Sequence, residues 1–154
     1  MGSLDQLQIS ECMTRQPYTI TPYASLVEAL EIMQQKKIRR LPVMDDGDLI
    51  GIITLNDIYR YSLPDVRYGK NLDTNYESLS KLTVITAMTE NPIAIYQADT
   101  IGHAAEILVE EKIGALPVVD ANKKLQGVIT ESDIFRLIAS EWCEKNTFNS
   151  AVGS

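Results

Sequence analysis

The sequence predicts a mixed α/β (α+β) fold of two tandem β-α-β-β-α units, related by pseudo-two-fold symmetry, with their sheets packed against each other. Three observations predict it: an internal repeat, the same order of β-rich and helical patterns in each copy, and a globular composition. The chain has 154 residues, of which 45% are hydrophobic and 23% are charged. This length allows one domain, or two packed halves that are each too small for a generous core.

The repeat emerges when the sequence is compared with itself at a shift of 75 residues. Met13-Thr14 then meets Met88-Thr89, and Leu41-Pro42-Val43 meets Leu116-Pro117-Val118. After Asp45 the shift becomes 76, because the second copy carries one extra residue. The clustered matches divide the chain into repeat 1 at 9–61, a linker at 62–83, repeat 2 at 84–145 and a tail at 146–154 that we expect to be flexible.

Each repeat predicts the same elements in the same order. In the first, a capping box at Ser25-x-x-Glu28 precedes apolar residues at helical spacing and predicts a helix from Leu26. Two β-rich runs around the turn at 45–48 predict a hairpin. A crossover helix joins the hairpin to the preceding strand, so that strand should lie parallel to its neighbour. The polar linker is long for a compact domain and is expected to be a surface strap or partly mobile.

Charge and composition exclude several classes of function. The net charge is −7, from 14 basic and 21 acidic residues, which argues against nucleic-acid polymers and anionic membranes as partners. No apolar run is long enough to span a membrane, and the N-terminus has no signal-peptide pattern. We therefore expect a cytoplasmic protein in which Cys12 and Cys143 are free thiols. One histidine and two distant cysteines predict no metal site, and no catalytic set of side chains is apparent, so we expect no enzyme activity.

The most distinctive recurring motif is Gly-x-x-Thr-x-x-Asp, where the hairpin ends and the next helix begins. Threonine at the N-cap and aspartate in the first turn form an ordinary helix cap. The same hydroxyl could donate to a phosphate oxygen, and the carboxylate could accept from ribose hydroxyls beside the helix N-terminus. The residues leave both interpretations open. The motif residues are Gly51, Thr54 and Asp57 in repeat 1, and Gly127, Thr130 and Asp133 in repeat 2.

With Met-Thr-x-x-Pro, Leu-Pro-Val and Gly-x-x-Thr-x-x-Asp present in both copies, the chain resembles a CBS-domain pair, or Bateman module, over nearly all of its length. The resemblance implies a stand-alone regulatory module that binds AMP, ADP, ATP or S-adenosylmethionine in the cleft between the repeats and modulates an unidentified partner protein. It also implies a homodimer, with no cofactor required beyond the adenine ligand. The helix of Trp142 is the sequence feature expected to form the dimer contact. The alternative is a non-catalytic interaction or dimerisation module that binds no nucleotide.

The resemblance assigns roles to individual residues. Ribose would be held by Asp57 and Asp133, phosphate by Thr54, Thr130, Arg39 and Arg40, and adenine by a pocket of Tyr18, Thr19, Ile20, Ile93, Ala94 and Ile95. The repeat partners of Arg39-Arg40 are the uncharged Gly114-Ala115, so we expect the site supplied by the two arginines to be the better nucleotide site. By the same resemblance, Thr130 and Asp133 are the expected partners of residues 19–20 and 39–40.

Overall fold

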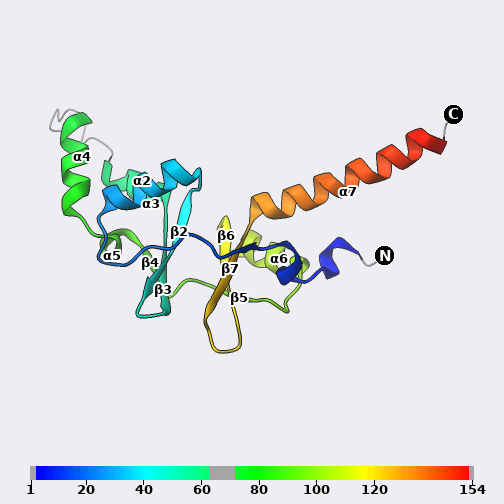
Figure 1. Ribbon diagram of the computed structural model, residues 1–154, viewed down its shortest axis with the longest axis horizontal. Helices are drawn as coiled ribbons and strands as arrows, with labels where there is room; N and C mark the ends of the chain where they lie inside the picture. The colour runs from blue at the N-terminus through cyan, green and yellow to red at the C-terminus, as the bar shows by residue number, and fades with distance from the viewer. Residues whose placement is uncertain (1–2, 63–71, 153–154) are drawn as a thin grey trace. The chain divides into compact units, whose positions relative to one another are not determined.

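The computed structural model describes residues 3–62 and 72–152, which form two compact units (Figure 1). Unit 1 comprises residues 1–16 and 93–154, and unit 2 comprises residues 17–92. Each unit has the mixed α/β architecture that the repeats predict. The units differ from the repeats in one respect: the Met-Thr segment at the start of each repeat belongs to the unit built mainly from the other repeat.

Unit 2 contains a three-stranded sheet in the order β2-β3-β4. Its elements are α2 (Leu26–Lys36), β2 (Arg40–Asp45), β3 (Asp48–Thr54), α3 (Leu55–Ser62), α4 (Leu72–Lys81), α5 (Val84–Ala87) and β4 (Thr89–Glu90). The hairpin β2–β3 turns at Asp46 and Gly47, which both have positive φ, as the Asp-Gly pair predicts. Ile20 bridges Val43 in parallel, which confirms the predicted crossover.

Unit 1 contains a four-stranded sheet in the order β1-β7-β6-β5. Its elements are the 3-10 helix η1 (Leu4–Gln6), α1 (Ile9–Cys12), β1 (Thr14–Arg15), β5 (Ile95–Tyr96), α6 (Ile101–Glu111), β6 (Ala115–Val119), β7 (Leu125–Thr130) and α7 (Glu131–Val152). β5 lies parallel to β6, and β6 and β7 form the antiparallel hairpin. The tail predicted from residue 146 is helical to Val152, as the last part of α7 (Figure 1).

Both units show the same local features at the ends of their helices and in their hairpins. The predicted capping box of α2 is present: the Glu28 amide donates to Ser25 Oγ at 3.1 Å, and the Ser25 amide donates to Glu28 Oε2 at 2.8 Å. α2 and α6 each end at a lysine in the left-handed region, Lys37 and Lys112, both with φ 55°. Each hairpin also has a register shift at the same place, after Val43 and after Val118. Matching positions of the two units can therefore be compared directly.

Each unit has its own hydrophobic core. In unit 2, Leu26, Leu41 and Ile53 are completely buried, and Leu79 of α4 joins them, so part of the predicted linker is a packed helix. In unit 1, Ile9 and Leu116 are completely buried. The sequence separates these core residues correctly into helix and strand patterns. It does not reveal that α1 packs with the second repeat.

A short strand closes the edge of each hairpin, and glycine makes this possible. β4 pairs with β3 at Gly51, and β1 pairs with β7 at Gly127. A Cβ atom on Gly51 would lie 2.6 Å from Met88 Sδ, and one on Gly127 would lie 2.5 Å from the Thr14 carbonyl oxygen and 2.9 Å from Met13 Sδ. These distances leave no room for a side chain, which explains why both motifs contain glycine.

Replacing these glycines should destabilise the fold. We expect Gly51→Ala or Gly127→Ala to lower the free energy of unfolding by about 1–3 kcal/mol, because the added methyl group overpacks the strand contact. Urea denaturation measures this change. Gly102→Ala, within α6, is the control and should leave stability unchanged or raise it by up to about 1 kcal/mol. Equal stability of Gly51→Ala and the parent would show that Met88 moves aside without cost.

Candidate functional site

The threonine and aspartate of the recurring motif meet at the junction between a strand and a helix. In unit 2, the Thr54 amide and hydroxyl both donate to Asp57 Oδ2 at 2.8 Å, and the Asp57 amide donates to Thr54 Oγ1 at 3.2 Å. In unit 1, the Thr130 amide donates to Asp133 Oδ2 at 2.9 Å, and the Asp133 amide donates to Thr130 Oγ1 at 3.1 Å. The structural interpretation of the motif as a reciprocal helix cap is therefore correct.

The cap uses Oδ2 of each aspartate and leaves Oδ1 beside an arginine one turn later. Oδ1 of Asp57 lies 3.9 Å from Nη1 of Arg60, and Oδ1 of Asp133 lies 3.4 Å from Nη1 of Arg136. The aspartate side chains are only 13% and 9% exposed, whereas the two arginines are 78% and 79% exposed. Such exposed ion pairs are weak, so a ligand hydroxyl can compete for Oδ1 while Oδ2 keeps the helix start in place.

The hairpin register brings an arginine to the motif in one unit only. Arg40 is the cross-strand partner of Thr54, so their side chains leave the same face of the sheet with Cβ atoms about 5 Å apart. Ala115 occupies the matching position beside Thr130. Unit 2 therefore combines a cation, a hydroxyl and a carboxylate, whereas unit 1 has only the last two. Regular counting from the turn would have paired Arg40 with Ile53, and only the register shift after Val43 brings it opposite Thr54.

Arg39 and its repeat partner hold the helix start through the backbone. The Leu55 amide donates to the Arg39 carbonyl oxygen at 2.8 Å, and the Glu131 amide donates to the Gly114 carbonyl oxygen at 3.1 Å. The Arg39 side chain is exposed. Because the first amide of each helix is already bonded, a ligand would meet side chains here before it met that amide.

The residues predicted to line the adenine pocket fall into two groups. Ile20 and Ile95 are 6% and 1% exposed, and their side chains belong to the two cores. The other four are more accessible, and they are Tyr18, Thr19, Ile93 and Ala94. One face of the Tyr18 ring is covered by Lys36, whose Nζ lies 5.0 Å from the ring centroid. Only the accessible group presents side chains to a ligand, and its role in adenine binding stays a prediction.

The structure distributes the predicted site residues between the units. Unit 2 holds residues 18–20, 39–40, 54 and 57, and unit 1 holds residues 93–95, 130 and 133. The expected pairing of Thr130 and Asp133 with residues 19–20 and 39–40 stays a prediction. Sequence reasoning gave no role to Arg60 and Arg136, although each follows its aspartate by three residues, the spacing at which helical side chains interact.

No group of three or more His, Cys, Asp or Glu residues within 3–62 and 72–152 is arranged to hold a metal ion. In the same part of the chain, none of the helices combines the length and the apolar character needed to cross a bilayer.

Comparison with known proteins gives consistent matches. The family model described as CBS domain matches residues 9–64 and 83–140. The protein MJ1225 of Methanocaldococcus jannaschii is 33% identical over 131 residues, which cover 85% of this chain and 47% of that protein. A second M. jannaschii protein, MJ1232, is covered over 44% of its length, so the chain spans about half of these relatives.

Two solved structures of similar fold contain adenosine ligands. The CBS domain pair of MJ0100, in complex with 5′-methylthioadenosine and S-adenosyl-L-methionine, has a TM-score of 0.73 and 29% identity, covering 88% of this chain and 98% of that one. CBSX2 of Arabidopsis thaliana, in complex with AMP, has a TM-score of 0.73 and 27% identity, covering 86% and 97%.

The pKa of the Cys12 thiol depends on its surroundings in unit 1. Burial raises the pKa of this thiol, and the nearby carboxylates of Glu11 and Asp133 raise it further. Because the thiolate is the reactive form, Cys12 should be alkylated by iodoacetamide at pH 8 more slowly than the exposed Cys143. Mass spectrometry of timed samples measures both rates. Asp133→Asn should speed the reaction of Cys12 alone, and equal rates in the folded parent protein would contradict the placement of Cys12.

Proposed function

Since this chain belongs to the CBS-domain family, we propose that it is a non-catalytic regulatory module that binds an adenine ligand and modulates a partner protein. The observation that carries the proposal is the cluster of Arg40, Thr54 and Asp57 in unit 2. The register pairs Arg40 with Thr54 and the cap joins Thr54 to Asp57, so a cationic, a hydroxyl and a carboxylate side chain start from one strand-to-helix junction. The AMP bound to CBSX2 and the adenosine ligands bound to MJ0100 support the same ligand class.

Each group has a distinct task in this proposal. Asp57 Oδ1 accepts a ribose hydroxyl in place of the weak contact with Arg60, while Oδ2 keeps its bonds to Thr54. The Arg40 guanidinium pairs with phosphate, since guanidinium groups form strong charge-assisted bonds with phosphate oxygens. Arg39 adds positive charge at the same strand end. The ligand is AMP, ADP, ATP or S-adenosylmethionine, and no other cofactor is required.

The two units differ in what they offer to phosphate. Thr130 and Asp133 repeat the cap geometry of unit 2, but Gly114 and Ala115 carry no charge. Phosphate binding in unit 1 would rest on the Thr130 hydroxyl alone. The proposal therefore assigns the tighter binding of charged nucleotides to the residues of unit 2.

Regulation requires that the ligand favour one of two arrangements of the protein, because a ligand with equal affinity for both shifts neither. The regulated partner is a separate protein or a second copy of this chain. We place the module in the cytoplasm, where half-buried Cys12 and exposed Cys143 stay reduced.

Isothermal titration with AMP and adenosine tests the roles of Arg40 and Asp57. Arg40→Ala should weaken AMP binding by at least about tenfold, since a charge-assisted bond contributes about 1.5–3 kcal/mol. It should leave adenosine binding nearly unchanged. Asp57→Ala should weaken both ligands, because both contain ribose.

Asp133→Ala is the matched control for Asp57→Ala. Both variants remove the same cap and should lose a similar amount of stability, about 1 kcal/mol. If Asp57 holds the ribose of the nucleotide bound at Arg40, only Asp57→Ala should lose binding. Loss of binding in Asp133→Ala alone would instead support the pairing of Thr130 and Asp133 with Arg39 and Arg40 that the family resemblance implies. If neither AMP, ADP, ATP nor S-adenosylmethionine binds to the parent protein, the sensing proposal is wrong.

An exposed stripe on α7 supports a second candidate function, that of an interaction module forming a homodimer. Phe135, Ile138 and Trp142 recur at i, i+3 and i+7 and are 66%, 51% and 69% exposed. The cap bonds also explain Thr54 and Asp57 without a ligand. In this alternative the Thr-Asp pairs are purely structural and α7 supplies the contact.

Sedimentation velocity tests the role of the α7 stripe. Trp142→Ser, on an exposed face, should leave the folded unit intact and convert dimers to monomers. Val109→Ser, which alters a 76% exposed residue of α6, controls for a general loss of apolar surface. A monomeric parent protein, or a Trp142→Ser variant that remains a dimer, would exclude α7 as the contact.

A further inference from the structure

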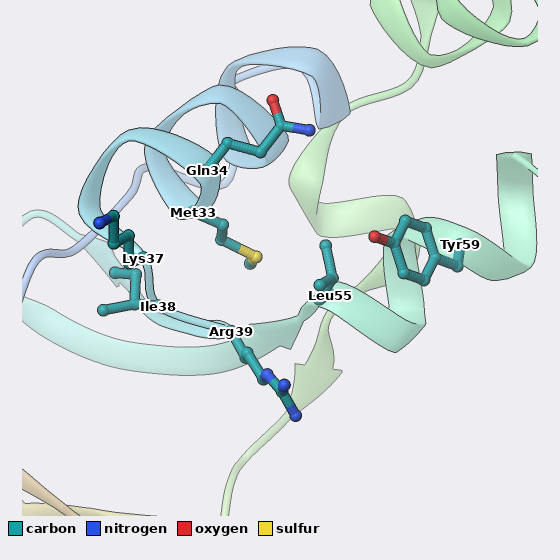
Figure 2. A pocket seen from close by; sticks show the side chains of 7 residues that line it. All are labelled: Met33, Gln34, Lys37, Ile38, Arg39, Leu55 and Tyr59. Carbon is teal, nitrogen blue, oxygen red and sulfur yellow. The ribbon is translucent and has the colours of Figure 1, made fainter.

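A pocket of about 240 Å³ lies in unit 2 between the end of α2 and the start of α3 (Figure 2). Its lining includes Met33 and Ile38 from one side and Leu55 from the other. Met33 is only 2% exposed, and the other two are half-buried, so the pocket has an apolar floor. Neither Arg40, Thr54 nor Asp57 lines it, so the pocket shares only Arg39 with the residues proposed to bind nucleotide.

Polar groups surround this floor, and all of them can donate hydrogen bonds. Figure 2 shows the Tyr59 hydroxyl turned toward the space next to Leu55, facing Met33, with the Gln34 amide above it on α2. Lys37 and Arg39 complete the rim, with their charged ends directed outward (Figure 2). Both are exposed and long, so they can turn toward a bound ligand without disturbing the core.

Among the described residues, no acidic side chain balances the positive charge of Lys37 and Arg39 on the rim. No carboxylate lines the pocket, and within residues 3–62 and 72–152 neither Lys37 nor Arg39 belongs to any ion pair. These two residues lie in a stretch with four basic residues in five positions, 36–40, in a chain whose net charge is −7. Positive charge is therefore concentrated next to an apolar cavity.

The matching positions of unit 1 show what distinguishes this pocket. Lys112 matches Lys37, and the apolar Leu108 and Ile113 match Met33 and Ile38. At the other four positions, unit 2 has Gln34, Arg39, Leu55 and Tyr59, and unit 1 has Val109, Gly114, Glu131 and Phe135. Unit 1 therefore lacks the three hydrogen-bond donors of Gln34, Arg39 and Tyr59, and it carries an acidic residue in place of Leu55. The same backbone frame thus carries an anion-attracting set of side chains in unit 2 only.

From this contrast we infer that the pocket of unit 2 binds a small organic anion, a carboxylate carried on a compact apolar body. The apolar body contacts Met33 and Leu55, and the carboxylate accepts hydrogen bonds from Tyr59, Lys37 and Arg39. The volume equals that of about eight waters, which fits a ligand about as large as a substituted benzene ring. Apolar burial and charge-assisted hydrogen bonds then act together.

Benzoate and benzamide are suitable probes, because they have nearly the same shape and differ in charge. A ¹H–¹⁵N NMR titration of the full chain should show saturable shifts of the Arg39, Leu55 and Tyr59 amide signals with benzoate, with a dissociation constant of about 1 mM. Benzamide should bind at least about tenfold more weakly, since a charged partner strengthens each hydrogen bond.

Substitutions that copy the residue at the matching position of unit 1 are suitable tests, because the same backbone already accommodates them there. Leu55→Glu and Arg39→Gly introduce the residues that unit 1 carries at the matching positions, and glutamate suits the first turn of a helix. Each should weaken benzoate binding by about tenfold or more. Lys37→Gln should weaken it several-fold, and Lys112→Gln, at the same left-handed position in unit 1, should have no effect.

Several results would overturn the inference. They are equal affinity for benzoate and benzamide, equal effects of Lys37→Gln and Lys112→Gln, or no saturable shift at Arg39, Leu55 and Tyr59. Repeating the titration with AMP present separates this inference from the proposed function. Benzoate should still bind when AMP is saturating, although more weakly where AMP also engages Arg39, and its binding should be unchanged if AMP does not bind at all.

Discussion

The fold depends on the close contact between each Met-Thr segment and the glycine of a hairpin. Gly51 lets β4 lie against β3, and Gly127 lets β1 lie against β7. Without these short strands, each hairpin would expose an unpaired edge. Closing the edge fixes the strand that ends at Thr54 or Thr130, and the threonine in turn starts the helix. The position of every candidate site residue on α3 and α7 follows from that contact.

Local and periodic features were predictable from the sequence. The capping box of α2, the turn at Asp46-Gly47 and the parallel crossover at Ile20 each depend on neighbouring residues or on a regular spacing. The segment exchange between repeats was not predictable, because β1 and β4 contain two residues each and carry no periodic signal. The helix α4 was missed for a different reason: only its packing against the unit 2 core, through Leu79, distinguishes it from a polar linker.

The cap geometry of the recurring motif was predictable from the sequence, whereas the residues around it were only partly predictable. Threonine and aspartate at i and i+3 indicate their own hydrogen bonds, and the structure contains them. The environment of Asp57 includes Arg60, one turn later, and Arg40, from the neighbouring strand. The second relationship depends on the hairpin register, which a bulge after Val43 alters along the strand. Ile20 was assigned to the adenine pocket by the family resemblance, and the sequence alone did not reveal that its side chain is only 6% exposed.

The exchange of Met-Thr segments also has an evolutionary consequence. A chain with a single repeat would have to lend this segment to a second molecule, so its folded form would be a swapped dimer that dissociates on dilution. Gene duplication and fusion make the exchange intramolecular. Association of the two halves then depends on the covalent link between them and no longer on the protein concentration. Two identical subunits become two halves that can change independently. Substitutions such as Arg40 against Ala115 can then accumulate in one half while the glycine contacts preserve the shared architecture.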